Sequence, residues 1–262
     1  TFTDGSVLDL IKAGNAYKSK LATVPGAGGE QGITGTTANH APTGLAFANA
    51  SSNVGFEYHS VADAFGIDGF KWGLSGSTGD DSDGVGSSST VESAYSIGVS
   101  YVSDAGDTTV TIGGGFVSAD DSNSTTSNSK GQESAVALSA VTGDLTVGVG
   151  WASGTEVATH TTVGQNSEVD GAEVMTAGAK YVSGDITFAV SYADGDAKDI
   201  VTLGSAGTST DSYEKTAASV TYSVASGVSA IIGFANEERG DEGATTKDQG
   251  GTSWYVGATL SF

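Results

Sequence analysis

Charged residues at alternating positions are the part of this sequence most able to do chemistry. Glu57 and His59 stand two residues apart, and Lys71, Lys180 and Lys215 also lie in segments where large apolar residues occupy every second position. Alternate side chains of a β-strand point to opposite faces. We therefore predict that all five charged or titratable side chains lie on the face opposite to the apolar ones, where they could attract or repel charged solutes.

Covalent catalysis has little support in the sequence. His40, His59 and His160 do not have the spacing of metal ligands. Ser and Asp are so abundant that a Ser-His-Asp triad could be drawn almost anywhere and has no diagnostic value. The glycine run 113–115 lies inside an alternating segment rather than before a helix, so it does not predict a phosphate site. We expect no cofactor and no enzymatic activity.

One acidic cluster suggests a cation. Asp80, Asp81 and Asp83 fall in the stretch DDSDG, which is a weak candidate for calcium binding in an exposed loop. The stretch lacks the regular spacing and the distal glutamate of a helix-loop-helix calcium site, so plain solvation is favoured. A calcium-binding, β-rich surface protein of the adhesin type is nevertheless the alternative function for this chain.

Composition excludes several other classes. The chain has 262 residues, 10 basic and 31 acidic, which gives a net charge of -21. Nucleic-acid binding is not expected, because phosphate contacts need a basic surface. With no cysteine, the chain cannot hold a disulfide scaffold or a thiolate zinc site. No apolar run is long enough for a transmembrane helix, and no signal peptide is visible.

Regular alternation dominates the chain from about residue 53. Eleven alternating segments, most about ten residues long, are predicted to be strands of the length that crosses a membrane when tilted. They are 54–59, 69–76, 93–102, 108–117, 133–141, 144–153, 173–182, 185–193, 214–224, 228–236 and 253–262. Short glycine-containing turns alternate with long polar loops, as in a barrel with different connections at its two ends.

The two faces of these strands differ in an unusual way. One parity holds large apolar residues, such as Phe70 and Trp72 or Val147 and Val149, while the other holds mainly Gly, Ser, Thr and Ala. The second face is too small and polar to contact lipid, but water would suit it. We predict that the apolar face contacts acyl chains and that the sheet closes around a wet interior, because hydrocarbon cannot satisfy an open sheet edge.

The terminal segment SWYVGATLSF and the segment NVGFEYHSVADAFGIDGFKWGLSGSTGD (53–80) resemble the general porins of Gram-negative outer membranes. The resemblance implies an outer-membrane porin, a water-filled channel for passive diffusion of ions and small hydrophilic solutes. It also implies contact with outer-membrane lipid, a homotrimer, and recognition of Phe262 by the barrel-assembly machinery. An outer-membrane enzyme of the phospholipase kind is disfavoured, because no Ser and His pair is apparent at the lipid boundary.

The predicted fold class is all-β, a transmembrane antiparallel up-and-down β-barrel. The resemblance implies about 16 strands in the full protein, of which about 11 lie in this sequence. Residues 1–52 would then form the long constriction-loop region, and residues 53–262 the transmembrane strands with long acidic external loops and short periplasmic turns. The competing count adds LAFANA (45–50) as a strand and closes a complete twelve-stranded barrel.

The internal loop is expected to carry charges that face the wall. Residues 6–21 have apolar spacing compatible with a short amphipathic helix. By resemblance, basic residues of a porin wall face acids of this loop and set ion preference. The pore-lining or constriction candidates are Asp4, Asp9, Lys12, Glu30, Glu57, His59, Lys71, Lys180 and Lys215. The acidic composition predicts a preference for cations.

Overall fold

The computed structural model describes eight stretches of the chain. They are residues 1–10, 16–27, 55–78, 91–121, 129–159, 166–198, 210–240 and 249–260. Phe262, LAFANA (45–50) and the cluster at Asp80, Asp81 and Asp83 lie outside these residues, as do Lys12 and Glu30. The predictions made for them therefore stay predictions.

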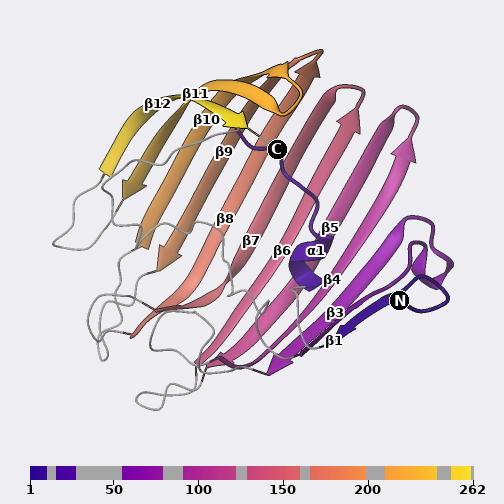
Figure 1. The fold of residues 1–262 in the computed structure, drawn as a ribbon. Helices are drawn as coiled ribbons and strands as arrows, with labels where there is room; N and C mark the ends of the chain where they lie inside the picture. The colour runs from indigo at the N-terminus through magenta and orange to yellow at the C-terminus, as the bar shows by residue number, and fades with distance from the viewer. Residues whose placement is uncertain are drawn as a thin grey trace.

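Twelve strands form one antiparallel sheet in which each strand pairs with its neighbours in the sequence (Figure 1). The strands are β1 (Val7–Leu10), β2 (Gly55–His59), β3 (Phe70–Thr78), β4 (Val91–Ala105), β5 (Thr108–Asp121), β6 (Ser129–Thr142), β7 (Leu145–Thr159), β8 (Asn166–Ser183), β9 (Ile186–Lys198), β10 (Thr210–Ala225), β11 (Val228–Gly240) and β12 (Gln249–Leu260). The sheet is open: β1 and β12 stand at its two ends, and no ladder joins them among the described residues.

The eleven predicted strands correspond to β2–β12, so the up-and-down all-β architecture is confirmed. The twelfth strand, β1, lies within residues 1–52, where the competing count placed a strand at LAFANA (45–50) instead. A helix was expected over residues 6–21, and that prediction is wrong for Val7–Leu10, which pairs antiparallel with β2. A short apolar run fits either periodicity, and here the unpaired edge of β2 supplies backbone partners. Of the residues of 6–21 that the structure describes, Ala16–Lys20 are helical and form α1.

The strands are longer than their alternating segments. β8, predicted over ten residues, spans the 18 residues Asn166–Ser183. The extra residues lie mainly at the ends away from the short turns and are mostly polar. Apolar alternation is needed only in the part of a strand that contacts lipid. Sequence patterns therefore find that part and miss the polar extension.

Tight turns close four of the hairpins at one end of the sheet. The connections β4–β5, β6–β7, β8–β9 and β10–β11 each have two residues between the paired strands. Each contains a glycine with positive φ: 65° at Gly106, 52° at Gly143, 58° at Gly184 and 75° at Gly227. Two-residue hairpins that match the strand twist need this left-handed backbone, which glycine adopts without steric cost.

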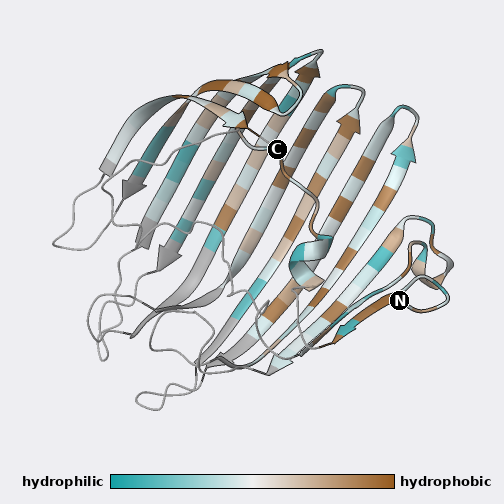
Figure 2. Ribbon diagram, in the orientation of Figure 1, coloured by the Kyte–Doolittle hydropathy of each residue, from teal (hydrophilic) through white to brown (hydrophobic). Residues whose placement is uncertain are grey.

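Hydrophobic and hydrophilic residues alternate along the strands (Figure 2), and the exposure of their side chains shows that the two faces of the sheet have the predicted character. The outer face carries the large apolar side chains, and they are exposed: Trp254 keeps 74% and Val256 83% of its accessible surface. The inner face carries small residues that are buried, such as Ala217 at 1% and Ala235 at 2%. The outer face is thus the reverse of a water-soluble protein's surface and suits a lipid environment. Among the described residues, the helices are all too short and polar to cross a bilayer.

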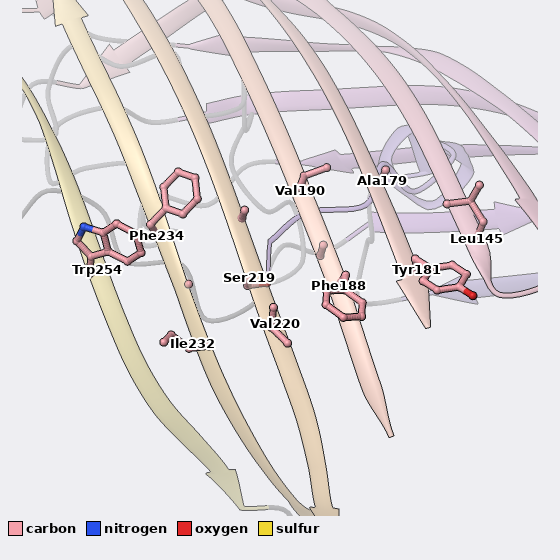
Figure 3. A pocket seen from close by; sticks show the side chains of 13 residues that line it. Leu145, Ala179, Tyr181, Phe188, Val190, Ser219, Val220, Ile232, Phe234 and Trp254 are labelled. Carbon is pink, nitrogen blue, oxygen red and sulfur yellow. The ribbon is translucent and has the colours of Figure 1, made fainter. Parts of the chain in front are cut away.

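A shallow pocket of about 430 Å³ indents the outer face over β7–β12 (Figure 3). Its large lining side chains, including Tyr181, Phe188, Val190 and Trp254, all belong to the outward-facing set. It offers apolar surface and almost no polar group, so the chemistry of charged or hydrophilic solutes belongs to the opposite face.

Candidate functional site: the inner face and the segment that crosses it

Residues 16–27, here called the crossing segment, run over the inner face of the sheet (Figure 1). The segment starts with α1, which contacts β2, β3, β4 and β5. It ends at Ala27, whose backbone N–H donates to the Ser191 hydroxyl on β9 across 3.3 Å. One short segment from the N-terminal part of the chain therefore spans eight neighbouring strands from β2 to β9.

Glycines on the inner face make room for this segment. A Cβ atom added at Gly113 would stand 1.9 Å from the Lys20 carbonyl oxygen, and one at Gly178 would stand 1.8 Å from that of Pro25. At Gly98 the same construction comes within 2.5 Å of the Ala16 carbonyl oxygen. Such distances exclude any side chain, so the backbone of the segment lies directly on the backbone of the wall.

Polar anchors fix α1 in place. The backbone N–H groups of Ala16 and Tyr17 donate to the hydroxyls of Ser75 and Ser96, at 3.3 and 3.2 Å, and the two hydroxyls are 2.7 Å apart. These bonds satisfy two of the amide donors that a helix leaves free in its first turn. The first turn of α1 is thereby bound to β3 and β4.

Tyr17 makes the deepest contact of the segment. Its side chain is fully buried, and its hydroxyl donates a short hydrogen bond to the Glu133 carboxylate on β6. Burial, together with this hydrogen bond and the negative charge of Glu133, raises the pKa of the Tyr17 phenol well above its usual range. The neutral phenol is therefore strongly favoured, and a charge-assisted hydrogen bond holds the segment on the wall.

A chain of titratable groups anchors the other end of α1. The Lys20 ammonium lies 3.1 Å from His59 Nδ1, and His59 Nε2 lies 3.1 Å from a Glu57 carboxylate oxygen. Burial and the nearby positive charge of Lys71 lower the pKa of Lys20, while Glu57 acts in the opposite sense. Three predicted site residues, Glu57, His59 and Lys71, thus meet the crossing segment at one place.

The remaining predicted wall residues lie on the same face but elsewhere. Lys180 is exposed on β8, two residues beyond Gly178. Lys215 on β10 pairs in register with Glu237 on β11, whose side chain is fully buried. Cross-strand partners share a face and can interact directly. Lys180 and Lys215 therefore belong to the inner wall, away from the cluster around Lys20.

The two described acids of the N-terminal region do not lie on the crossing segment. Asp4 precedes β1, and its carboxylate accepts hydrogen bonds from the Ser6 backbone N–H and hydroxyl at 2.9 and 2.7 Å, which lowers its pKa. Asp9 is a residue of β1 and pairs with Glu57. It therefore shares the inner face with Glu57 and is part of the wall rather than of a loop.

Sequence reasoning missed the two residues that hold the segment most firmly, Tyr17 and Glu133. Glu133 is the first residue of the predicted strand 133–141, and its parity is that of the inner face. The available signal was the set of glycines with that parity, Gly73, Gly98, Gly113, Gly148 and Gly178, which indicates a close backbone approach. Among the described residues, no group of three His, Asp or Glu side chains could hold a metal ion.

The sheet is an antiparallel meander with an apolar outer face and a small, polar inner face, and a chain segment crosses the inner face. This arrangement is typical of the channel-forming membrane β-proteins. Comparison with known proteins supports this class. The family model described as Gram-negative porin matches residues 11–261. The chain belongs to the Gram-negative porin family. None of the curated proteins compared with the chain matches it.

Solved structures share the fold. The outer-membrane channel DcaP of Acinetobacter baumannii is similar with a TM-score of 0.58 and 10% identity, over 95% of this chain and 71% of that one. OmpTdeltaL8, a loop-deletion mutant of the outer-membrane protein OmpT of Vibrio cholerae, gives 0.53 and 14%, over 97% and 74%. A porin structure refined at 1.8 Å gives 0.52 and 17%, over 98% and 77%. Family and fold identify an outer-membrane channel protein.

Proposed function

We propose that this protein forms a water-filled channel through which ions and small hydrophilic solutes diffuse passively, with a preference for cations, and that it performs no covalent chemistry. The observation that carries the proposal is the crossing segment. It lies on the polar inner face of a sheet whose outer face is apolar, which is the arrangement expected of a constriction inside a barrel. Solutes would pass between this segment and the rest of the wall.

The cation preference rests on the charge of the whole molecule. The net charge of -21 creates a negative potential that concentrates cations at the channel mouths. The inner face itself is closer to balance, because its wall acids Asp9, Glu57, Glu133 and Glu237 are matched by the wall lysines Lys71, Lys180 and Lys215 and by Lys20 of the crossing segment. We therefore expect a moderate preference that depends on single wall charges.

Assembly follows the same proposal. A homotrimer is expected from the family resemblance, and Phe262 is expected to be the residue that the barrel-assembly machinery recognises. An intact native mass in detergent three times that of the chain would support the first expectation. Replacing Phe262 with Ser while leaving β12 unchanged tests the second expectation, because the variant should insert less well into the outer membrane but keep its fold in detergent.

The channel is tested by electrical recording in planar lipid bilayers. The protein is added to one side, and single-channel current is measured with a KCl gradient across the membrane. We expect discrete current steps and a reversal potential of the sign given by cation preference. A preparation that inserts but never conducts would overturn the channel, and a reversal potential of the opposite sign would overturn the cation preference.

Two charge variants localise the selectivity. Lys71→Gln removes a positive charge beside Lys20 and should increase the cation preference, whereas Glu57→Gln removes the acid beside His59 and should decrease it. Lys180→Gln, on the inner wall away from the cluster around Lys20, is the control for the loss of any one wall lysine. Equal shifts of the reversal potential in Lys71→Gln and Lys180→Gln would contradict a local role for Lys71.

A further inference from the structure

The β2–β3 connector, residues 60–69, does not behave like the other connections at its end of the sheet. It has ten residues between His59 and Phe70, whereas the four other described hairpins at this end have two. Two residues are enough to reverse an antiparallel pair of strands. The additional length therefore needs an explanation other than chain reversal.

The connector is an ordered structure. The Asp63 carboxylate accepts a hydrogen bond from the Gly69 backbone N–H at 2.7 Å, and the backbone bonds Gly66 N–H to Asp63 and Ile67 N–H to Ala64 close a 3-10 turn over Ala64–Gly66. The Gly69 carbonyl accepts from the Val102 N–H of β4 at 3.0 Å. The connector is thus built into the edge of the barrel wall, and the position of its tip is fixed.

At its tip the backbone holds Phe65 in an unusual conformation. Phe65 has a φ of 60° and Asp63 a φ of 63°, both in the left-handed region. A bulky aromatic residue rarely adopts this conformation. Such backbone strain persists where the surrounding structure imposes it. It is concentrated at functional sites, such as those that bind a ligand.

The strained residue points an apolar ring outward. Phe65 keeps 79% of its accessible surface and Ile67 keeps 50%. The Phe65 ring stacks on Trp72, with centroids 6.2 Å apart and planes at 11°, and also contacts the ring of Phe70 at 6.1 Å. Trp72 and Phe70 have the parity of the outer, lipid-facing side of β3. The exposed tip therefore continues the membrane-facing surface past the end of the strands.

We propose that the β2–β3 connector is a membrane anchor whose tip, Phe65 and Ile67, inserts into the boundary between headgroups and acyl chains of the leaflet at the short-turn end of the barrel. The partner is the lipid surface itself. Aromatic rings prefer this boundary, and the exposed Asp68 beside Ile67 keeps a charge on the watery side. The left-handed backbone at Phe65 turns the ring onto the outer face instead of leaving it below the barrel.

The absence of cysteine in the native chain allows a direct test. A nitroxide spin label is attached to the Phe65→Cys variant in vesicles of phosphatidylethanolamine and phosphatidylglycerol. Its collision rates with oxygen, which dissolves in lipid, and with a water-soluble nickel complex are then measured. Asp107→Cys, in the exposed two-residue β4–β5 turn, provides the aqueous reference, and Val256→Cys on the outer face of β12 provides the lipid reference.

We expect the oxygen-to-nickel ratio at position 65 to exceed that at position 107 several-fold and to approach that at position 256. A ratio equal to that at position 107 would overturn the proposal, because it would mean that the tip of the connector lies in water. Low collision rates with both reagents would also overturn it, because the tip would then be covered by protein, such as a second copy of the chain. If Phe65→Cys does not fold, the Ile67→Cys variant gives the same three outcomes, none of which depends on conduction.

Discussion

At the scale of single residues, the pairing of Tyr17 with Glu133 shows how a polar interior can hold a loop firmly. The phenol is buried between its segment and the wall, and the carboxylate that accepts its hydrogen bond is buried on that wall. A buried carboxylate needs a donor, and hydrogen bonds to charged groups contribute about 1.5–3 kcal/mol, more than neutral ones. This contact ties the segment to the wall, and removing either residue would weaken the attachment.

Removing the Tyr17 hydroxyl should loosen the crossing segment. Tyr17→Phe leaves the ring in place and deprives Glu133 of a donor, so we expect attachment to weaken by about 1–3 kcal/mol. The readout is the rate at which a hydrophilic maleimide labels the thiol of an Ala22→Cys variant, since Ala22 belongs to the segment and is buried while the segment is attached. Tyr95→Phe, an exposed outer-face change, is the control and should leave the labelling rate unchanged.

Because of the same contact, the attachment of the crossing segment to the wall should depend on pH in the alkaline range. The raised pKa of Tyr17 means that the attached phenol keeps its proton at a pH where a released phenol, with an ordinary pKa near 10, has lost it. Attachment is therefore complete below about pH 10 and weakens above it, by at most about 1.4 kcal/mol per pH unit. Labelling of Ala22→Cys, relative to a free thiol, should rise above pH 10, and a flat profile would contradict this linkage.

At the scale of elements, small residues decide where the crossing segment can lie. Gly113→Ala would place a methyl group 1.9 Å from the Lys20 carbonyl, so the segment must move. Overpacking of this kind costs about 1–3 kcal/mol, and we expect the Ala22→Cys labelling rate to increase at least about fivefold. Gly257→Ala, on the inner-face parity of β12 with its nearest contact at 3.4 Å, is the matched control. No increase in Gly113→Ala would show that the segment does not rest on this glycine.

Strands were predictable from the residue pattern, whereas an internal loop was expected only by resemblance and the route of the crossing segment over the wall was not predicted. Alternation of Leu145, Val147 and Val149 with small residues marks a strand and its outer face, because each residue responds to its own side of the sheet. The segment depends on partners far along the chain: Tyr17 contacts Glu133, and Ala27 contacts Ser191. No local pattern records such pairs, and Val7–Leu10 was misassigned for the same reason, since its strand exists through pairing with β2.

At the scale of the whole molecule, the large apolar side chains lie on the outside of the fold rather than in a core. Membrane lipid covers them there. Substitutions should therefore be tolerated differently on the two faces. Val149→Arg places a charge among acyl chains within the apolar part of β7 and should lower the free energy of unfolding in lipid vesicles by about 2–4 kcal/mol. Thr111→Arg, on the inner face of β5, should cost much less, since its charge can reach water.

Urea unfolding followed by tryptophan fluorescence provides both free energies, since the chain has three tryptophans. Equal destabilisation by Val149→Arg and Thr111→Arg would mean that the two faces have similar surroundings. That result would contradict the orientation of the entire sheet, and with it the channel.

The route of the crossing segment also constrains the order in which the protein is built. Ala27 meets Ser191, a residue 164 positions further along the chain. The segment is made early, but the surface beneath it is complete only after β9 has joined the sheet. The Ala27–Ser191 hydrogen bond, and with it the final seat of the segment, can therefore form only late in folding, once the hairpins that carry β9 are in place.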